Sequence, residues 1–213
     1  MNGCASRRGA LGVIAVGISL MAVRAARAEH YDVLADNEEK ISSYEDIPVI
    51  GNPEGDVTII EWFDYEDHAS RRYAPELRRV VRNDGNIRLV LKSWPVRGEG
   101  SIAAARMVLA AKYQGKYEAA HDAMISSNMP LTERRTRKLL SRAGLDMDRW
   151  QKDLDTNARA IDETLARNAE EAAALRLKLV PSYLINSLVV PGSLDDYWLN
   201  KLIASARQDS GSF

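Results

Sequence analysis

The sequence predicts an α/β domain that is interrupted by a helical insertion. Two apolar, β-branched runs at residues 57–63 and 87–92 have the composition of strands that are buried on both faces. A helical pattern at residues 67–82 lies between them, and apolar strands joined through a helix indicate a parallel βαβ unit. A long helical stretch follows, and a unit of two short strands and a helix closes the domain.

The elements before and inside the insertion follow from local signals. Residues 29–48 are polar with helical spacing, and the turn-like residues 51–56 predict a loop before the first strand. The helix at 67–82 ends at a turn over residues 83–86. The insertion, at about residues 101–179, has breaks at Gly115, Pro130 and Gly144, so we expect four or five helices. Its longest helix, at 158–179, is rich in charges that indicate a solvated face.

The last part of the domain begins after Pro181. Strands are expected at residues 183–185 and 188–190, joined by a turn of two residues. Ser193 and Asp196 form a capping pair that starts a final helix, which ends at about Arg207. Residues 208–213 are expected to be a disordered tail.

The first 28 residues have the three parts of an export signal. Arg7 and Arg8 precede an apolar run at residues 10–23, and a small-residue site ends at Ala28. A membrane anchor is the competing interpretation, but this run is short of the roughly 20 residues that span a bilayer. We therefore expect cleavage after Ala28, by the general secretory or the twin-arginine route, and a periplasmic or secreted protein without a stable membrane anchor.

The net charge and the cysteine content exclude some classes of protein. Removing residues 1–28 takes away four arginines and no acid, so the formal charge falls from −1 to −5. A mildly acidic chain without a basic patch does not indicate a nucleic-acid binder. The single cysteine, Cys4, lies in the predicted signal, so the cleaved protein would contain neither thiols nor disulfides.

One stretch carries a family resemblance. Residues 61–72, Glu-Trp-Phe-Asp-Tyr-Glu-Asp-His-Ala-Ser-Arg-Arg, resemble the active-site strand, loop and helix of the DsbA family of thiol-disulfide oxidoreductases. The resemblance extends over residues 49–207 and includes Gly51-Asn52-Pro53, His121-Asp122-Ala123 and Val189-Val190-Pro191-Gly192. It implies a thioredoxin fold with an inserted helical subdomain, which agrees with the predicted order of elements.

The active-site loop departs from that family. Where the family carries Cys-x-x-Cys, this chain carries Asp67, His68, Ala69 and Ser70. Disulfide exchange needs both thiols, so we expect no catalytic residue here. Asp67 is expected to cap the helix, and Ser70 to bond locally to the backbone. A sharper hypothesis is that Asp67 presents a fixed negative charge to a partner where the family presents a thiolate.

Other chemistry at this loop is disfavoured. Asp67, His68 and Ser70 do not form a hydrolytic triad, because neighbouring positions on a helix do not face each other. Adjacent Glu66, Asp67 and His68 seldom converge on one metal ion, and His30 and His121 are not spaced to complete a site. We expect neither a metal nor a cofactor, an exposed His68, and a packing role for His121.

Two further positions are assigned through the resemblance. Glu61 resembles the family's buried acid beneath the cysteine pair; it needs a buried partner, for which Lys92 is the candidate. If Asp67 lies near Glu61, repulsion should raise one of the two pKa values. Pro181 matches the family's cis-proline, and Val180, Pro181 and Ser182 are the expected peptide-binding residues. The family pairs this backbone with an extended substrate.

Three functions remain open at this stage. The first is a redox-inactive protein that binds unfolded or extended polypeptides as a chaperone, adaptor or decoy. The second is the family's oxidoreductase activity, which requires a thiol. The third is a structural or assembly protein that forms a homo-oligomer through residues 29–46.

Overall fold

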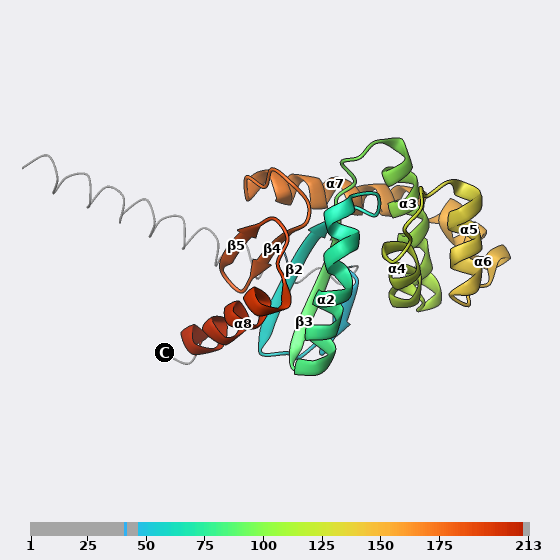
Figure 1. Cartoon of the computed structure of the whole chain (residues 1–213). Helices are drawn as coiled ribbons and strands as arrows, with labels where there is room; N and C mark the ends of the chain where they lie inside the picture. Colours follow the sequence, from blue (N-terminus) through green and yellow to red (C-terminus); the bar gives the residue numbers. More distant parts are fainter. Residues whose placement is uncertain (1–40, 42–46, 211–213) are drawn as a thin grey trace, which may run out of the picture.

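The structure is a computed structural model that describes Ile41 and residues 47–210 (Figure 1). The predicted signal peptide, the helix and oligomerisation segment expected within residues 29–46, and residues 211–213 lie outside this part, apart from Ile41. A five-stranded sheet forms the centre, with strand order β1-β3-β2-β4-β5. The strands are β1 (Val49–Gly51), β2 (Val57–Phe63), β3 (Ile87–Ser93), β4 (Ser182–Ile185) and β5 (Leu188–Pro191).

The predicted βαβ unit is confirmed. Strands β2 and β3 pair in parallel, and helix α2 (His68–Asp84) connects them. The other neighbouring strands pair antiparallel. Helix α2 ends where Gly85 adopts a left-handed conformation, with φ of 74°.

The two faces of the sheet are covered by different elements. One face, which carries Ile59, Phe63 and Leu89, packs against α2 and α8 (Asp196–Ser210) and against the insertion. The opposite face, which carries Ile60 and Trp62, packs against the end of α7 (Ala158–Ala174) and against Ile41 and Ile47. The chain therefore has a helix, sheet, helix layering around its core.

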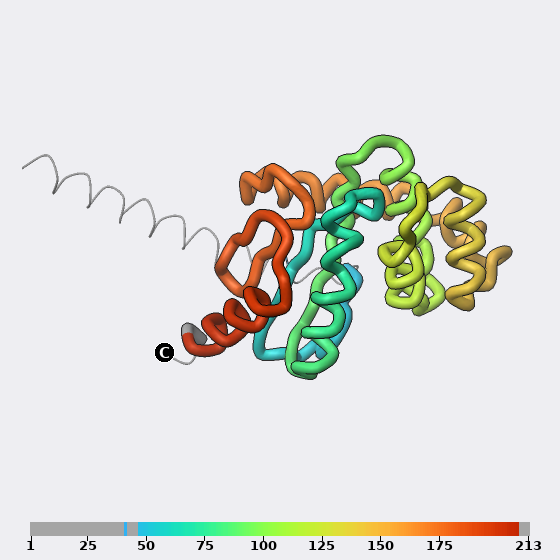
Figure 2. The backbone as a smooth tube through the Cα atoms, viewed as in Figure 1, coloured from blue at the N-terminus to red at the C-terminus, as the bar shows by residue number. Residues whose placement is uncertain are grey.

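The insertion forms a lobe beside the sheet (Figure 2). In the described residues it consists of α3 (Glu99–Leu109), a 3-10 helix (Ala110–Gln114), α4 (Tyr117–Ile125), α5 (Glu133–Arg142), α6 (Met147–Thr156) and α7. Five α-helices agree with the expected number. The lobe shares the larger hydrophobic core with α2, so it is packed onto the domain.

Some boundaries differ from the expectation. The loop expected before β2 contains the short edge strand β1, which pairs with β3. Helix α7 ends at Ala174 rather than residue 179, because Arg176 adopts a positive φ of 56° and the chain turns there. Helix α8 runs to Ser210, so residues 208–210, expected in the tail, belong to the helix.

The start of α8 is also different. The Asp195 carboxylate, rather than the predicted pair Ser193 and Asp196, accepts a hydrogen bond from the Trp198 backbone at 2.9 Å. Asp196 instead pairs with Arg79 on α2 at 2.6 Å, which joins α8 to the helix beside it. Among the helices that the structure describes, none is long and apolar enough to cross a membrane.

Candidate functional site

Three segments meet at one end of the sheet. Strand β2 leads into the loop of Asp64 to Asp67, and the loop that follows the parallel strand β3, residues 94–98, lies beside it. On its other side, antiparallel β4 begins next to the same loop, preceded by Val180 and Pro181. The strand order therefore collects these segments although they lie far apart in the sequence.

Asp64 holds two of these segments together. Its buried carboxylate accepts hydrogen bonds from the backbone N–H groups of Glu66, Val96 and Arg97 at 2.7 to 2.9 Å, and from the Ser101 hydroxyl at 2.7 Å. Four donors satisfy a carboxylate that is 1% exposed. We did not predict this role, although an acid directly after a buried apolar strand is a signal for it.

Asp67 caps α2, as predicted. Its Oδ2 accepts a hydrogen bond from the Ser70 N–H at 2.8 Å, and the Ser70 hydroxyl accepts one from the Asp64 N–H at 3.4 Å. The hypothesis of a presented negative charge is wrong, because the Asp67 side chain is 3% exposed and its Oδ1 forms an ion pair with Arg97. Nothing in the sequence identifies this partner, which is thirty residues away in another loop.

The expected peptide-binding residues lie beside the Asp64 loop but do not expose their side chains. The Val180–Pro181 peptide bond is cis, and Val180, Pro181 and Ser182 are all buried. Because Ser182 pairs with Trp62, extending the same register places Val180 opposite Asp64. Within the described part of the chain, the Val180 backbone N–H and C=O have no hydrogen-bond partner. They are the groups that an extended peptide would pair with.

Apolar side chains flank this position. Val96 lies in the loop after β3 and Leu179 precedes Val180, and each is 46% exposed. Both lie near the Asp64 loop. The Val96 N–H donates a hydrogen bond to Asp64, and Leu179 directly precedes Val180, which the strand register places opposite Asp64. The loop thus has an exposed apolar residue on either side, an arrangement that suits an extended peptide.

The expected ion pair between Glu61 and Lys92 is wrong. Lys92 Nζ pairs with Glu171 Oε2 on α7 at 2.6 Å. Side chains alternate along a strand, and Glu61 is paired with Leu91, so Lys92 points to the opposite face of the sheet. The charges of α7 are therefore not all solvated, because Glu171 reaches the core.

Glu61 is instead buried beside Tyr183, its cross-strand neighbour on β4. Burial raises the pKa of its carboxyl group to about 8, against smaller lowering effects of Tyr183 and Arg78. Asp67 is not a cause of this shift, so the expected mutual repulsion is not found. The Glu61 carboxyl group is therefore protonated at neutral pH.

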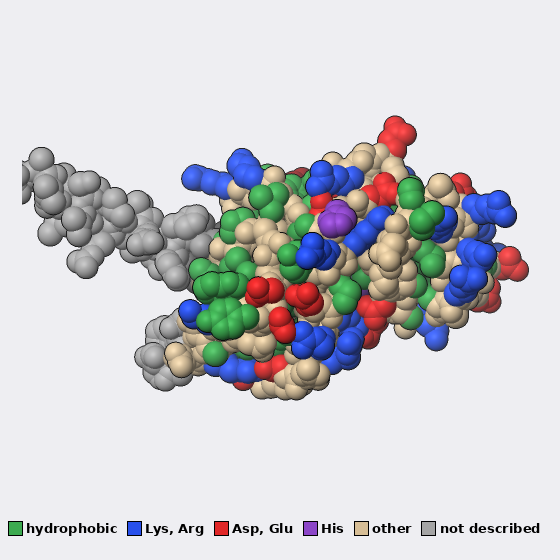
Figure 3. All heavy atoms as spheres, viewed as in Figure 1, with side chains coloured by type: hydrophobic (Ala, Val, Ile, Leu, Met, Phe, Trp, Pro, Cys, Tyr) green, Lys and Arg blue, Asp and Glu red, His purple; other side chains and the backbone are tan. Residues whose placement is uncertain are grey.

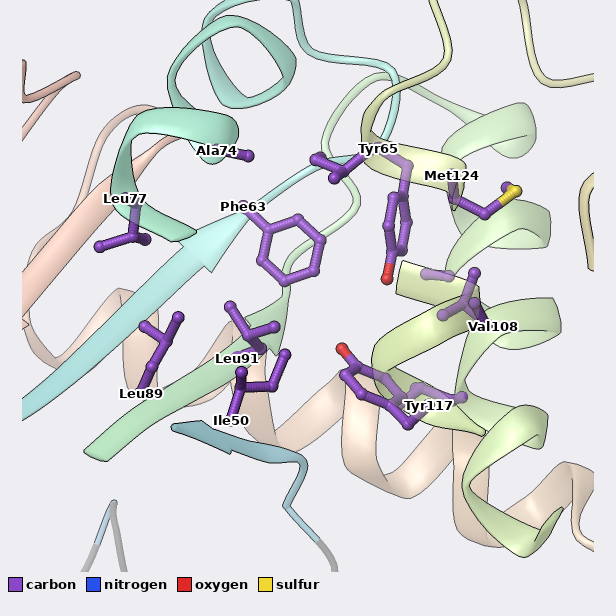
Figure 4. Packing of buried hydrophobic residues seen from close by; sticks show 14 of the residues in the cluster. Ile50, Phe63, Tyr65, Ala74, Leu77, Leu89, Leu91, Val108, Tyr117 and Met124 are labelled. Carbon is purple, nitrogen blue, oxygen red and sulfur yellow. The ribbon is translucent and has the colours of Figure 1, made fainter. Parts of the chain in front are cut away.

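A cluster of aromatic rings connects this end of the sheet to the insertion. The Tyr65 hydroxyl lies 3.0 Å from His121 Nδ1, and Phe63 packs edge-on against both rings. Figure 4 shows Tyr65 and Tyr117 with their hydroxyl groups turned toward each other between the sheet and the helices. Burial and the nearby Arg78 lower the pKa of His121 to about 3, so the imidazole is neutral. Its packing role is as expected.

The surface near the loop is polar. His68 is exposed, as expected. Figure 3 shows basic and acidic side chains intermixed on this face of the molecule. The described residues contain no group of three side chains that would hold a metal ion. In the part of the chain that the structure describes, the site therefore consists of the unpaired backbone groups of Val180 and the exposed apolar side chains of Val96 and Leu179. Beside them, the guanidinium of Arg97 is paired with the buried carboxylate of Asp67.

The family described as thioredoxin matches residues 43–205. The chain belongs to the thioredoxin family. No curated protein matches it.

Similar solved structures agree with this assignment. A thioredoxin-like oxidoreductase from Silicibacter pomeroyi is 36% identical, with a TM-score of 0.76 over 80% of this chain and 97% of that one. The thiol-disulfide exchange protein alpha-DsbA2 from Wolbachia pipientis is 20% identical, with a TM-score of 0.76 over 82% and 96% of the two chains. BdbD from Bacillus subtilis is 15% identical, with a TM-score of 0.68 over 78% and 95%. The predicted DsbA-like thioredoxin fold is thus confirmed.

Proposed function

We propose that this protein is an exported, redox-inactive member of the thioredoxin family that binds extended polypeptide beside Pro181. The observation that carries the proposal is the open backbone of Val180 next to Pro181, in a chain whose residues 67–70 contain no sulfur. Export rests on the signal predicted in residues 1–28. The role is that of a chaperone, an adaptor or a decoy.

Main-chain pairing supports binding without sulfur. An extended peptide that aligns with Val180 gains backbone hydrogen bonds, and the exposed Val96 and Leu179 offer apolar contacts to its side chains. None of these interactions uses a thiol. The alternative, disulfide exchange, proceeds through thiolates that attack disulfide sulfurs. The carboxylate at position 67 and the hydroxyl at position 70 cannot form these bonds to sulfur.

Fluorescence anisotropy of the full chain with labelled, cysteine-free extended peptides tests this proposal. We expect saturable binding that a reductant does not change. Peptides N-methylated at alternate amides should bind more weakly than unmodified ones, because they lose hydrogen-bond donors on one edge. Two results would reject pairing with Val180. One is absence of binding, and the other is unchanged binding of both N-methylated peptides, the one methylated at odd and the one methylated at even amides.

A pair of matched variants locates the site on the protein. Val180 is itself buried, so the exposed Leu179 is the better position to change. Leu179→Ser should weaken binding about fivefold, the loss expected for one partly buried leucine. Trp198→Ser removes an apolar side chain of similar exposure on α8 and should leave binding unchanged. The reverse result would place the peptide on α8.

A further inference from the structure

The carboxylate that replaces the family's attacking thiol is already occupied. Asp67 Oδ2 accepts the Ser70 N–H, and Oδ1 accepts two N–H groups of Arg97, one of them from Nε at 3.1 Å. The Asp67 side chain is almost fully enclosed. A bound partner therefore does not meet this carboxylate directly.

Arg97 is the group that faces solvent at this position. Its side chain is 57% exposed, while its backbone N–H is fixed by Asp64 at 2.9 Å. A guanidinium carries five N–H groups, of which Asp67 engages two, so donors remain on the exposed side. Arg97 thus combines a fixed backbone with free hydrogen-bond donors.

The neighbouring charges are mixed. His68 and Arg72 are exposed at the start of α2. Among the acids, Asp64 is buried under four donors, and Glu66 Oε1 is held by the Leu131 N–H at 2.9 Å. Glu99 is exposed in the first turn of α3. The exposed groups next to Asp67, by contact or in sequence, are therefore the guanidinium of Arg97 and the imidazole of His68, with exposed Arg72 and Glu99 in the adjoining helices.

We propose that the site beside Pro181 selects polypeptide segments with a carboxylate side chain at the residue next to Arg97, and that Arg97 binds this carboxylate. This inference rests on the proposed function. Arginine is suited to the role because its planar fork matches a carboxylate in geometry and charge. A lysine or arginine of the peptide would instead have to displace Arg97 from Asp67.

Three peptides that differ only in a central Glu, Gln or Lys test the selection. Titrated into the full chain at low salt, the Glu peptide should bind about fivefold more tightly than the Gln peptide, as expected for a partly exposed ion pair. The Lys peptide should bind more weakly than the Gln peptide. The preference should shrink at high salt, because exposed charges are screened.

Variants of Asp67 and Arg97 separate the contributions of these two residues to peptide binding. Asp67→Asn keeps a good helix cap and releases Arg97, so the preference for the Glu peptide should increase. Asp67→Asn combined with Arg97→Gln should abolish the preference, so that the Glu and Gln peptides bind this variant equally well. Arg82→Gln, at the far end of α2, is the control for loss of one positive charge and should retain the preference.

The outcomes separate this inference from the proposed function. Equal binding of all three peptides would overturn the role of Arg97 and leave peptide binding intact. Tighter binding of the Lys peptide would overturn it also, and would make Asp67 the recognition group. If none of the peptides binds, the proposed function fails and the inference fails with it.

Discussion

At the scale of single residues, Glu61 is a buried acid for which the described residues provide no ion-pair partner. Its Oε1 has no hydrogen-bond partner in the described part of the chain, and burial holds its pKa at about 8. A protonated carboxyl group avoids the cost of a buried charge. Glu61 therefore makes folding sensitive to pH.

Stability should fall as the pH rises from about 4.5 to about 8. The unfolded carboxyl group ionises near 4.5, whereas the folded one keeps its proton up to about 8, so the folded state binds more protons in this window. Urea unfolding between pH 6.5 and 9 measures the trend. Glu61→Gln should be less sensitive to pH over this range than the parent. Parallel curves for the two proteins would show that Glu61 does not titrate as described.

His121 should influence the stability of the protein at lower pH than Glu61 does. Its folded pKa of about 3 lies below the ordinary histidine pKa of 6.5, so the unfolded state binds more protons between these values. Its contribution to stability is complete above about pH 6.5 and is lost as the pH falls toward 3. Urea unfolding at pH 4 and pH 6.5 should show a smaller difference for His121→Phe, which keeps an aromatic ring. An unchanged difference would assign the acid sensitivity to other groups.

At the scale of elements, strand alternation decides which contacts form. The buried runs predicted β2 and β3, and an acid at the helix start predicted the cap at Asp67. The partner of Lys92 was assigned wrongly because only its strand, and not its face, was considered. The strand β1 has three residues, too few for a periodic pattern to be recognised.

The pair of Lys92 and Glu171 gives a test at this scale. Lys92→Met leaves Glu171 without this cation at the sheet, and should lower the free energy of unfolding by about 3 kcal/mol. Lys92→Met together with Glu171→Leu should recover most of that loss, because no charge is then left unpaired. Urea unfolding of the two single variants and the double variant completes the cycle. Additive losses would show that the two residues are not coupled.

Gly51 is the last residue of β1 and pairs with Arg88 on β3. Its φ is +83°, and a Cβ atom there would lie 2.5 Å from the Ile87 carbonyl oxygen. Gly85 also has a positive φ, of 74°, but has open space around the Cβ position. Both alanine variants carry the backbone strain, but only Gly51→Ala adds a clash with backbone. Its unfolding free energy should fall by about 2 kcal/mol more than that of Gly85→Ala. Equal losses would show that β1 moves aside easily.

At the scale of the whole molecule, the thioredoxin fold is formed by a chain that carries Asp67 and Ser70 at the start of α2. Residues near in sequence, such as Asp67 and Ser70, could be assigned from the sequence. The contacts of Asp64 and Arg97 could not, because they join loops that only the folded sheet brings together. The resemblance gave the position of Pro181, but burial of the Val180 side chain became evident only in the structure.

Restoring the two thiols should restore the chemistry. Asp67→Cys with Ser70→Cys places cysteines at the start of α2, where helix N–H groups and Arg97 would favour a thiolate. This variant should exchange disulfides with a fluorescent disulfide peptide, whereas the parent should show no rate above background. Equal rates for the two proteins would mean that positions 67 and 70 do not control the reaction.

The central claim is that an extended peptide pairs with the Val180 backbone, and amide hydrogen exchange at Val180 tests it most directly. Because this N–H has no hydrogen-bond partner among the described residues, it should be protected only weakly in the free protein. A saturating extended peptide should slow its exchange at least about tenfold, with little change at Trp198 on α8. Unchanged exchange at Val180 in a demonstrably peptide-bound protein would contradict the account.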